Sequence, residues 1–208
     1  MAQIVFPAES SASAMRPLCV DLDGTLVKSD TLAESLLVLA RTRPARALAL
    51  PGKILRGKAA FKAYVTELVS LDVAHLPYNR KVLQFLNQER GRGRAIYLAT
   101  GADQRLAQRV ADHLGIFTGV LGSDGVTNLT GSNKLDGLRR RLDSDAFDYI
   151  GNSRADLPLL AYATEAMVAN PSLGLRLGLR LHRIRVVREF KERTRPQRSL
   201  ARAARPRR

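Results

Sequence analysis

Two carboxylates, Asp21 and Asp23, follow an apolar run in the segment PLCVDLDGTLVKSD, which extends from Pro17 to Asp30. Burying either carboxylate without a partner costs several kcal/mol or forces it to protonate. Alternate residues of a strand face the same way, so the two side chains are expected to point together and to repel unless a cation lies between them. Mg²⁺ takes oxygen ligands, keeps several waters and accepts a phosphate oxygen. The pair therefore suggests a magnesium site.

Three further segments place polar residues where a strand is expected to end or a helix to begin. IYLATGA contains Thr100 and Gly101, GSNKLDGL contains Lys134, and YIGNSRADLP contains Asn152 and Asp156. In an open α/β sheet, ligands bind beyond the carboxyl ends of the strands, where the strand order reverses. The four segments together are therefore expected to form a site for phosphoryl transfer.

Phosphoryl transfer would give each of these residue types a task. A carboxylate can attack phosphorus to form an aspartyl-phosphate, while a second carboxyl group protonates the leaving oxygen and later activates water. The Thr100 hydroxyl and main-chain N–H groups can hold phosphoryl oxygens, and Lys134 can neutralise charge in the transition state. Gly24 lets the backbone turn sharply beside the phosphate. Taken singly, each feature has a plain structural explanation, and only the four in order favour catalysis.

The elements that must position these residues are indicated by short apolar runs that alternate with helix-like stretches. This alternation predicts an α/β fold with a parallel sheet and covering helices. The helices are expected at about residues 104–114, 134–142 and 156–164, and a final strand at 183–190 is expected at the sheet edge.

The pattern changes between residues 31 and 89, where three segments have helical spacing and no strand is expected. In the middle segment, Phe61, Val65 and Leu68 repeat at i, i+4 and i+7, which is one face of a helix. A helical cap inserted after the first strand is therefore predicted, with residues 17–30 and 90–190 forming the core.

Charge is uneven along the 208-residue chain, which has a formal net charge of +15 and 45% hydrophobic residues, enough for a sizeable core. Residues 191–208 hold eight Lys or Arg and one acidic residue. This basic tail is expected to be disordered, and contact with an anionic membrane surface or nonspecific contact with nucleic acid are the alternatives. No aromatic residue is interleaved with the arginines and no nucleic-acid-binding motif is visible, so no specific nucleic-acid partner is expected.

The remaining bulk features concern location. Residues 1–16 lack the basic start and long apolar stretch of a secretion signal and are expected to be a disordered extension. No segment has about 18 consecutive apolar residues, so none is expected to span a bilayer. The single cysteine, Cys19, lies in the apolar run before Asp21 and is expected to be a buried thiol. The protein is expected to be cytoplasmic, and a position at the inner face of the membrane is compatible with this expectation.

The motifs DLDGTL, IYLATGA, GSNKLDGL and GNSRAD, in this order, resemble those of the haloacid dehalogenase-like (HAD) superfamily of Mg²⁺-dependent phosphatases. The resemblance covers about residues 17–190 and implies a Rossmannoid sheet with helices on both faces. The insertion resembles the cap of the phosphoserine phosphatase-like branch, which covers the site and selects substrates. The resemblance therefore implies a phosphatase that acts on a phosphorylated small molecule.

Site residues are carried over from the family pattern one by one. The pattern implies that Asp21 is the nucleophile and that Asp23 is the general acid and base. It implies that Thr100, with Gly101 beside it, and Lys134 bind the phosphoryl group. Asp21 therefore carries the aspartyl-phosphate in this reading.

The same pattern implies that Mg²⁺ binds an Asp21 oxygen, the Asp23 main-chain carbonyl and Asn152. The family usually has aspartate where this chain has Asn152, so one negative charge is missing beside the metal and weaker binding is expected. Asp156 stands at the family's second acidic position, where it could hold a metal-bound water or orient Lys134. This departure puts catalysis in question more than it does the fold.

A narrower resemblance concerns the phrases LPYNRKVLQFL, YIGNSRADLPLL and VANPS, followed by a basic stretch. They are similar to the HAD domain at the N-terminus of some bacterial UbiA-type prenyltransferases. This resemblance implies the alternative function, a catalytically weak or inactive accessory or regulatory module of a membrane prenyltransferase. The basic tail would then lie where a linker approaches the cytoplasmic membrane face.

Overall fold

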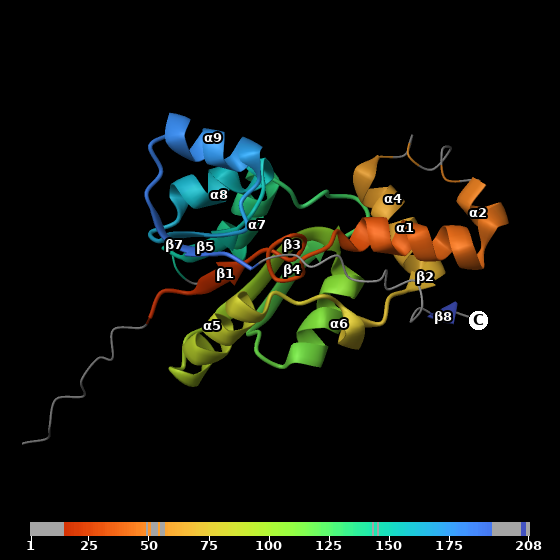
Figure 1. Ribbon diagram of the computed structural model, residues 1–208, viewed down its shortest axis with the longest axis horizontal. Coiled ribbons are helices and arrows are strands. Elements are labelled where there is room, and N and C mark those ends of the chain that lie inside the picture. Colours follow the sequence, from red (N-terminus) through yellow and green to blue (C-terminus); the bar gives the residue numbers. More distant parts are fainter. Residues whose placement is uncertain are drawn as a thin grey trace, which may run out of the picture.

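A six-stranded parallel sheet lies at the centre of the protein (Figure 1). The computed structural model describes residues 15–48, 50, 54, 57–142, 144, 146–192 and 205–206. The strand order is β4-β3-β1-β5-β6-β7. The strands are β1 (Leu18–Val20), β3 (Ile96–Asp103), β4 (Gly119–Ser123), β5 (Asp148–Gly151), β6 (Ala166–Ala169) and β7 (Val186–Phe190). The predicted parallel α/β fold is confirmed, and β7 lies at a sheet edge as expected.

Helices cover both faces of the sheet (Figure 1). One face carries α5 (Arg80–Gly91) and α6 (Gln104–Leu114), and the other carries α7 (Ser132–Arg141), α8 (Leu157–Tyr162) and α9 (Leu173–Leu181). A short 3₁₀ helix, η2 (Arg154–Asp156), precedes α8.

The sheet separates two hydrophobic cores, and β1 contributes to both. Leu18 and Val20 belong to the core that includes Leu86 of α5, whereas Cys19 belongs to the core that includes Leu159 of α8. This division follows from the two-residue repeat of a strand. Because both faces are covered, the strand reads as a continuous apolar run. Cys19 is fully buried as predicted, and burial raises the pKa of its thiol.

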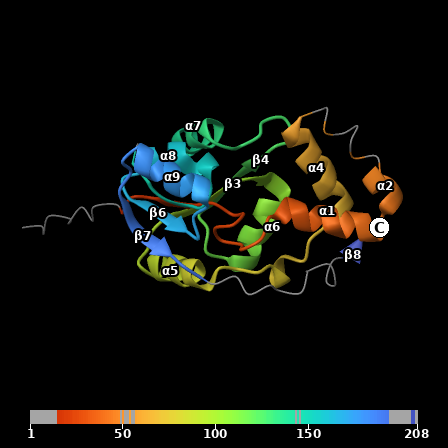
Figure 2. The same ribbon diagram turned by 45° about the horizontal axis from the view of Figure 1, so that its top comes forward.

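The chain between β1 and β3 is largely helical, where the sequence predicted a helical cap over residues 31–89. Its elements are α1 (Thr31–Thr42), α2 (Pro44–Leu48), α4 (Lys58–Leu68), the two-residue β2 (Val69–Ser70) and the 3₁₀ helix η1 (Val73–His75). Figures 1 and 2 show α1, α2 and α4 grouped together on one side of the sheet, away from α7, α8 and α9. The insertion also leads into α5, which packs on the sheet.

Strand β2 was not expected from the sequence. It pairs antiparallel with β8 (Arg205–Pro206). A two-residue strand is too short to show a hydrophobic repeat, so its pairing depends on a distant segment. The other residues of the predicted basic tail from 193 onwards, and residues 1–14 of the predicted extension, lie outside the described residues. None of the helices in the described part of the chain has the length and hydrophobicity needed to cross a membrane.

Candidate active site

The site lies at the carboxyl end of β1, which is flanked by β3 and β5. This is where the strand order reverses, the usual place for a ligand in such a sheet. A cavity of about 400 Å³ opens there. Its walls come from the loop after β1, from α1 and α4, from the end of β3 and the start of α6, from the segment leading into α7, and from the loop after β5. Segments far apart in the sequence thus meet around one cavity.

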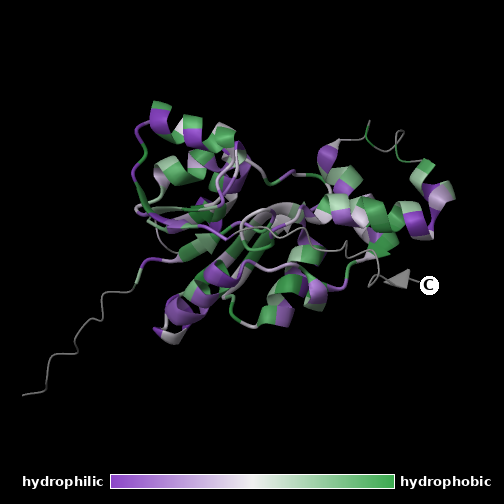
Figure 3. Cartoon of the chain, in the orientation of Figure 1, coloured by the Kyte–Doolittle hydropathy of each residue, from purple (hydrophilic) through white to green (hydrophobic). Residues whose placement is uncertain are grey.

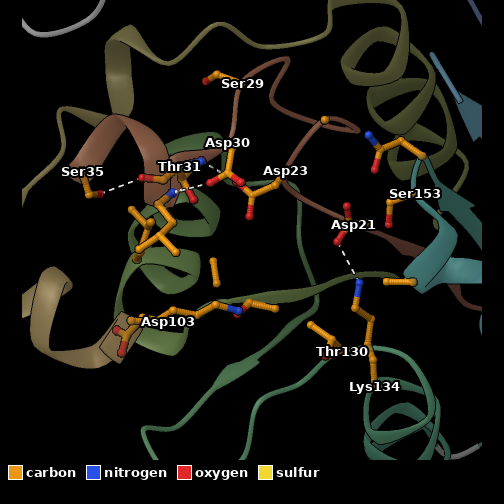
Figure 4. A pocket seen from close by; sticks show the side chains of 18 of the residues that line it. Asp21, Asp23, Ser29, Asp30, Thr31, Ser35, Asp103, Thr130, Lys134 and Ser153 are labelled. Atoms are coloured by element: carbon orange, nitrogen blue, oxygen red, sulfur yellow. Dashed lines mark hydrogen bonds and ion pairs between the residues drawn. The ribbon is translucent and has the colours of Figure 1, made fainter. Parts of the chain in front are cut away.

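Asp21 is buried at this cavity, and protein donors hold both of its carboxylate oxygens. Lys134 Nζ donates to Oδ1 at 2.8 Å, and Thr25 Oγ1 donates to Oδ2 at 3.1 Å. Figure 4 shows the Asp21 and Lys134 side chains directed toward one another. Burial raises the pKa of Asp21 to about 7, although the Lys134 ammonium opposes that shift. The carboxylate is therefore fixed in place in an environment that disfavours its charge.

Lys134 lies at the centre of a buried polar cluster. Besides Asp21, its ammonium donates to Tyr149 Oη at 3.1 Å and to Asp156 Oδ1 at 3.2 Å. The Tyr149 hydroxyl in turn donates to Asp156 Oδ1 at 2.8 Å. Burial alone would lower the pKa of Lys134, but the two carboxylates raise it. All three N–H donors of the ammonium have acceptors, so its position is tightly defined.

Asp156 organises the loop after β5. Its Oδ2 accepts hydrogen bonds from Asn152 N at 3.1 Å, Ser153 N at 3.0 Å and Ser153 Oγ at 3.0 Å. Burial opposes ionisation, but Lys134 and these N–H groups lower the pKa of Asp156 overall. Both oxygens of Asp156 are engaged with protein donors, which corresponds to the role of orienting Lys134.

Asp23 lines the same cavity but has its own partner. Its Oδ1 accepts a hydrogen bond from Thr31 N at 2.7 Å, at the start of α1 (Figure 4). Burial raises the pKa of Asp23, while the hydrogen bonds from Thr31 lower it. Asp30 accepts from the N–H groups of Leu32 and Ala33 and caps α1. The first helix of the insertion thus fixes the second carboxylate.

Asn152 carries a buried acceptor that is not satisfied. Its side-chain Oδ1 has no hydrogen-bond partner among the described residues. A buried unsatisfied acceptor costs about 1–3 kcal/mol, so it calls for a cation or a water. Gly24, whose φ is 76°, lies against this amide, and a Cβ at Gly24 would collide with it.

These oxygens fit a hard divalent cation. Asn152 Oδ1, an Asp21 oxygen and the Asp23 main-chain carbonyl are all oxygen donors, as Mg²⁺ prefers. Among the described residues no group of three His, Cys, Asp or Glu side chains is suited to a metal ion. A metal here would therefore depend on the amide and on the main-chain carbonyl.

Thr100 and Gly101 take different positions relative to the cavity. Thr100 is fully buried, and its hydroxyl accepts a hydrogen bond from Ala102 N at 3.0 Å. Gly101 and Ala102 line the cavity, whereas Thr100 is not part of its lining. The structure thus places main-chain groups at the cavity wall, with the Thr100 hydroxyl supporting them.

Lys62 was not predicted from the sequence. It lies on α4, lines the cavity, and its Nζ donates to the Gly101 carbonyl at 2.5 Å and to Asn128 Oδ1 at 2.8 Å. Burial lowers the pKa of Lys62, although Asp23 and Asp30 oppose that shift. One lysine in a helical segment gives no sequence signal for such a contact. Tyr149 was missed for a different reason, because it sits in an apolar run that reads as core.

Comparison with known proteins points to one family. The model of that family, described as haloacid dehalogenase-like hydrolase, matches residues 18–161. The uncharacterized protein y4nM of Sinorhizobium fredii (strain NBRC 101917 / NGR234) is 36% identical over 164 residues. The match covers 79% of this chain and 32% of that protein, so the chain spans about a third of the length of this curated relative.

Solved structures share the fold. A protein of unknown function from Bordetella pertussis Tohama I has a TM-score of 0.62 and 20% identity, covering 83% of this chain and 98% of that one. A substrate-bound phosphoserine phosphatase complex has a TM-score of 0.57 and 11% identity, covering 86% of this chain and 93% of that one. At these identities the likeness concerns the α/β fold.

Proposed function

The chain belongs to the haloacid dehalogenase-like hydrolase family, and from this premise we propose that it is a Mg²⁺-dependent phosphatase that hydrolyses a phosphomonoester of a small molecule. The observation that carries the proposal is the buried Asp21 carboxylate, held by Lys134 at 2.8 Å and Thr25 at 3.1 Å at the edge of a 400 Å³ cavity. A fixed carboxylate in a desolvated site is a suitable nucleophile for phosphorus.

In the first step, an Asp21 oxygen attacks the phosphorus atom and the bond from phosphorus to the ester oxygen breaks. Asp23 gives its proton to the leaving oxygen, so that an alcohol departs. Burial raises the pKa of Asp23, which favours the protonated form that this transfer needs. The product on the enzyme is an aspartyl-phosphate.

In the second step, Asp23 takes a proton from a water molecule, which attacks phosphorus. The bond between phosphorus and the Asp21 oxygen breaks, which releases inorganic phosphate and restores the carboxylate. Lys134 offsets charge on the phosphoryl oxygens while Asp156 and Tyr149 hold its ammonium in place. Lys62 adds a second positive charge beside Gly101.

Asp21, the Asp23 carbonyl and Asn152 would hold Mg²⁺, which supplies positive charge to the phosphoryl oxygens. The unsatisfied Asn152 Oδ1 supports this assignment.

The experiment measures phosphate release from a panel of phosphomonoesters with Mg²⁺ or with EDTA. We expect Mg²⁺-dependent turnover in the natural chain and a loss of at least about 1,000-fold in Asp21→Asn, because the nucleophile is gone. Asp136→Asn is the matched control, since Asp136 is exposed on the same helix as Lys134, and it should keep full activity. Rapid quenching should trap one phosphoryl group on the peptide that contains Asp21. Turnover retained in Asp21→Asn would exclude the mechanism.

Asn152 favours a second candidate, in which the domain is catalytically weak or inactive and serves as an accessory module of a membrane prenyltransferase at the cytoplasmic membrane face. An amide in place of a carboxylate leaves the cation with one less negative charge nearby. The basic tail would contribute attraction to anionic lipid.

The substitution Asn152→Asp separates the two candidates. If the natural chain is inactive and Asn152→Asp turns over phosphomonoesters, the accessory module is supported. If the natural chain turns over substrate and Asn152→Asp only lowers the Mg²⁺ concentration needed, the phosphatase is supported.

A further inference from the structure

Helix α9 carries a row of exposed leucines on its outer side. Leu173, Leu177 and Leu181 are 86%, 60% and 72% exposed. They recur every four residues and therefore lie along one side of the helix. Figure 1 shows α9 at the outside of its layer, beyond α8, and Figure 3 shows hydrophobic and hydrophilic residues alternating along it.

The inner side of α9 is already packed without these leucines. Leu175 and Leu179 are buried in the core that α8 shares. Gly178 is also buried, and a Cβ there would collide with Leu157 of α8, so the two helices approach closely. The fold therefore does not require leucine on the outer side. Single exposed leucines are ordinary, but a continuous row marks a surface that binds something.

The chemistry around the row is strongly basic. From Leu173 to Arg188 the chain holds five arginines and no acidic residue. Arg176 and Arg180 follow the leucines around the helix, and Arg176 pairs with Glu189 at 2.6 Å. The exposed arginines on this side of the molecule are Arg176, Arg180, Arg183 and Arg185. Arg188 is also exposed but stacks on Phe85 of α5, on the opposite face of the sheet, so it is not part of this surface.

We propose that this surface, made of the three leucines and the four arginines from Arg176 to Arg185, docks on an anionic lipid bilayer. The leucines enter the boundary between headgroups and acyl chains, and the arginines contact lipid phosphates. A helix with leucine on one side and arginine beside it has the composition of an interfacial helix that lies in the membrane plane. Charge complementarity selects anionic lipid over a neutral bilayer.

The first test measures flotation with vesicles of phosphatidylcholine alone or of phosphatidylcholine mixed with phosphatidylglycerol. The natural chain should float with the mixed vesicles and not with the neutral ones. The triple variant Leu173→Ser, Leu177→Ser, Leu181→Ser keeps every charge, including those of the tail. It should bind the mixed vesicles at least about tenfold more weakly, because it loses the apolar contact. The control replaces Leu48 and Val126, which are 83% and 90% exposed elsewhere, with serine and should bind like the natural chain.

Thermal unfolding checks that the triple variant is folded, and its midpoint should match that of the control, since the substituted side chains are exposed. Equal flotation of the triple variant and the natural chain would overturn the proposal. So would a chain that ignores both kinds of vesicle but self-associates through the leucines in size-exclusion chromatography, because a second copy would then cover the row.

The second test locates the contact directly. Cys19 is the only cysteine and is buried, so a fluorophore on Leu177→Cys reports one position. With mixed vesicles its emission should shift to the blue and become protected from an aqueous quencher. The same label on Val126→Cys should not respond. A Leu177→Cys label that stays accessible on vesicle-bound protein would show that the basic tail alone carries the binding.

Discussion

The ammonium of Lys134 is shared by two carboxylates, Asp21 and Asp156. One lysine cannot balance both, and Asp156 is further stabilised by the N–H groups of Asn152 and Ser153. Asp21 therefore carries the unbalanced charge, which is why burial is able to raise its pKa. A cation beside Asp21 restores the balance and takes the place of a proton.

The first prediction follows from this competition. The pKa of Asp21 is raised from 3.8 to about 7, so below that pH the metal-free protein holds a proton that the cation must displace. The apparent Mg²⁺ affinity should therefore rise by up to about tenfold per pH unit below this value and level off above it.

Calorimetric titration at several pH values, in buffers of different ionisation enthalpy, measures both the affinity and the released proton. Asp21→Asn serves as the control and should bind Mg²⁺ weakly without this pH dependence. An affinity in the natural chain that does not change between about pH 5.5 and 8 would contradict the assignment.

The sequence alone could predict that the motif residues lie close together, because a local pattern marks the position of each one. Asp21 and Asn152 come after apolar strands, and Lys134 comes at a helix start, so strand polarity alone predicts that they meet. Their roles remain predictions. Lys62 reaches the cavity only through the packing of α4 on β3, and no local pattern encodes that contact.

At the scale of elements, the turn after β1 depends on Gly24. Its φ of 76° is unfavourable for other residues, and a Cβ would also push against the Asn152 amide. Gly93, in the turn after α5, has a φ of 82°, but a Cβ there would meet no atom of the described residues within 4 Å. Alanine substitutions at the two glycines can therefore be compared to separate the effect of backbone strain from the effect of displacing Asn152.

We expect Gly24→Ala and Gly93→Ala to lose similar stability from strain, on the order of 1–2 kcal/mol each. Only Gly24→Ala should also lose Mg²⁺-dependent stabilisation and phosphate release, because its methyl group displaces the amide oxygen. Thermal unfolding with and without Mg²⁺ measures both effects. A full Mg²⁺ shift in Gly24→Ala would show that Asn152 is not a ligand.

Element boundaries were predictable where capping signals are present. The helix expected at 104–114 matches α6, because Asp103 caps its start and Gly115 ends it in the left-handed conformation. Helix α7 starts at Ser132, before the expected 134, and its N-cap Gly131 offers no side-chain signal. The pairing of β2 with β8 joins two-residue segments far apart in the chain, so no sequence window contains it.

At the scale of the whole molecule, a buried ionic network ties the sheet together at the end opposite the site. Arg94 donates to Glu89 of α5 at 2.8 Å, to the main-chain carbonyl of Arg16 at 2.7 Å, and to Asp148 of β5. Arg16, Arg94 and Asp148 lie at the amino ends of β1, β3 and β5, away from the cavity. The network therefore supports the fold rather than the chemistry.

Arg94→Met should lower the free energy of unfolding by about 3–5 kcal/mol, because Glu89 and Asp148 lose their buried partner and their remaining ion pairs are with Arg92 and Arg16, whose side chains are 67% and 43% exposed. Arg92→Met is the matched control, since Arg92 pairs with the same Glu89 from a side chain that is 67% exposed, and it should cost no more than about 1 kcal/mol. Urea unfolding measures the difference. At temperatures where both variants are folded, their phosphate release should match that of the natural chain. Equal destabilisation by Arg94→Met and Arg92→Met would refute the role of burial.

The overall architecture was predictable because alternation of strand and helix segments limits the arrangements of an α/β sheet. The place of α5 was less evident. Its periodicity shows an apolar side but not what that side contacts, and in the structure Phe85 meets Phe190 of the edge strand with ring centroids 5.3 Å apart. Which layer a helix joins is decided by contacts far away in sequence.

The Lys62 ammonium joins α4 to the Gly101 carbonyl and to Asn128. A negatively charged ligand that attracts this ammonium would weaken the hydrogen bonds between the insertion and the sheet, whereas a neutral ligand would leave them intact. The strength of this contact would then depend on the charge of the ligand. We therefore expect an anionic ligand, but not a neutral one, to loosen the contact between α4 and the sheet.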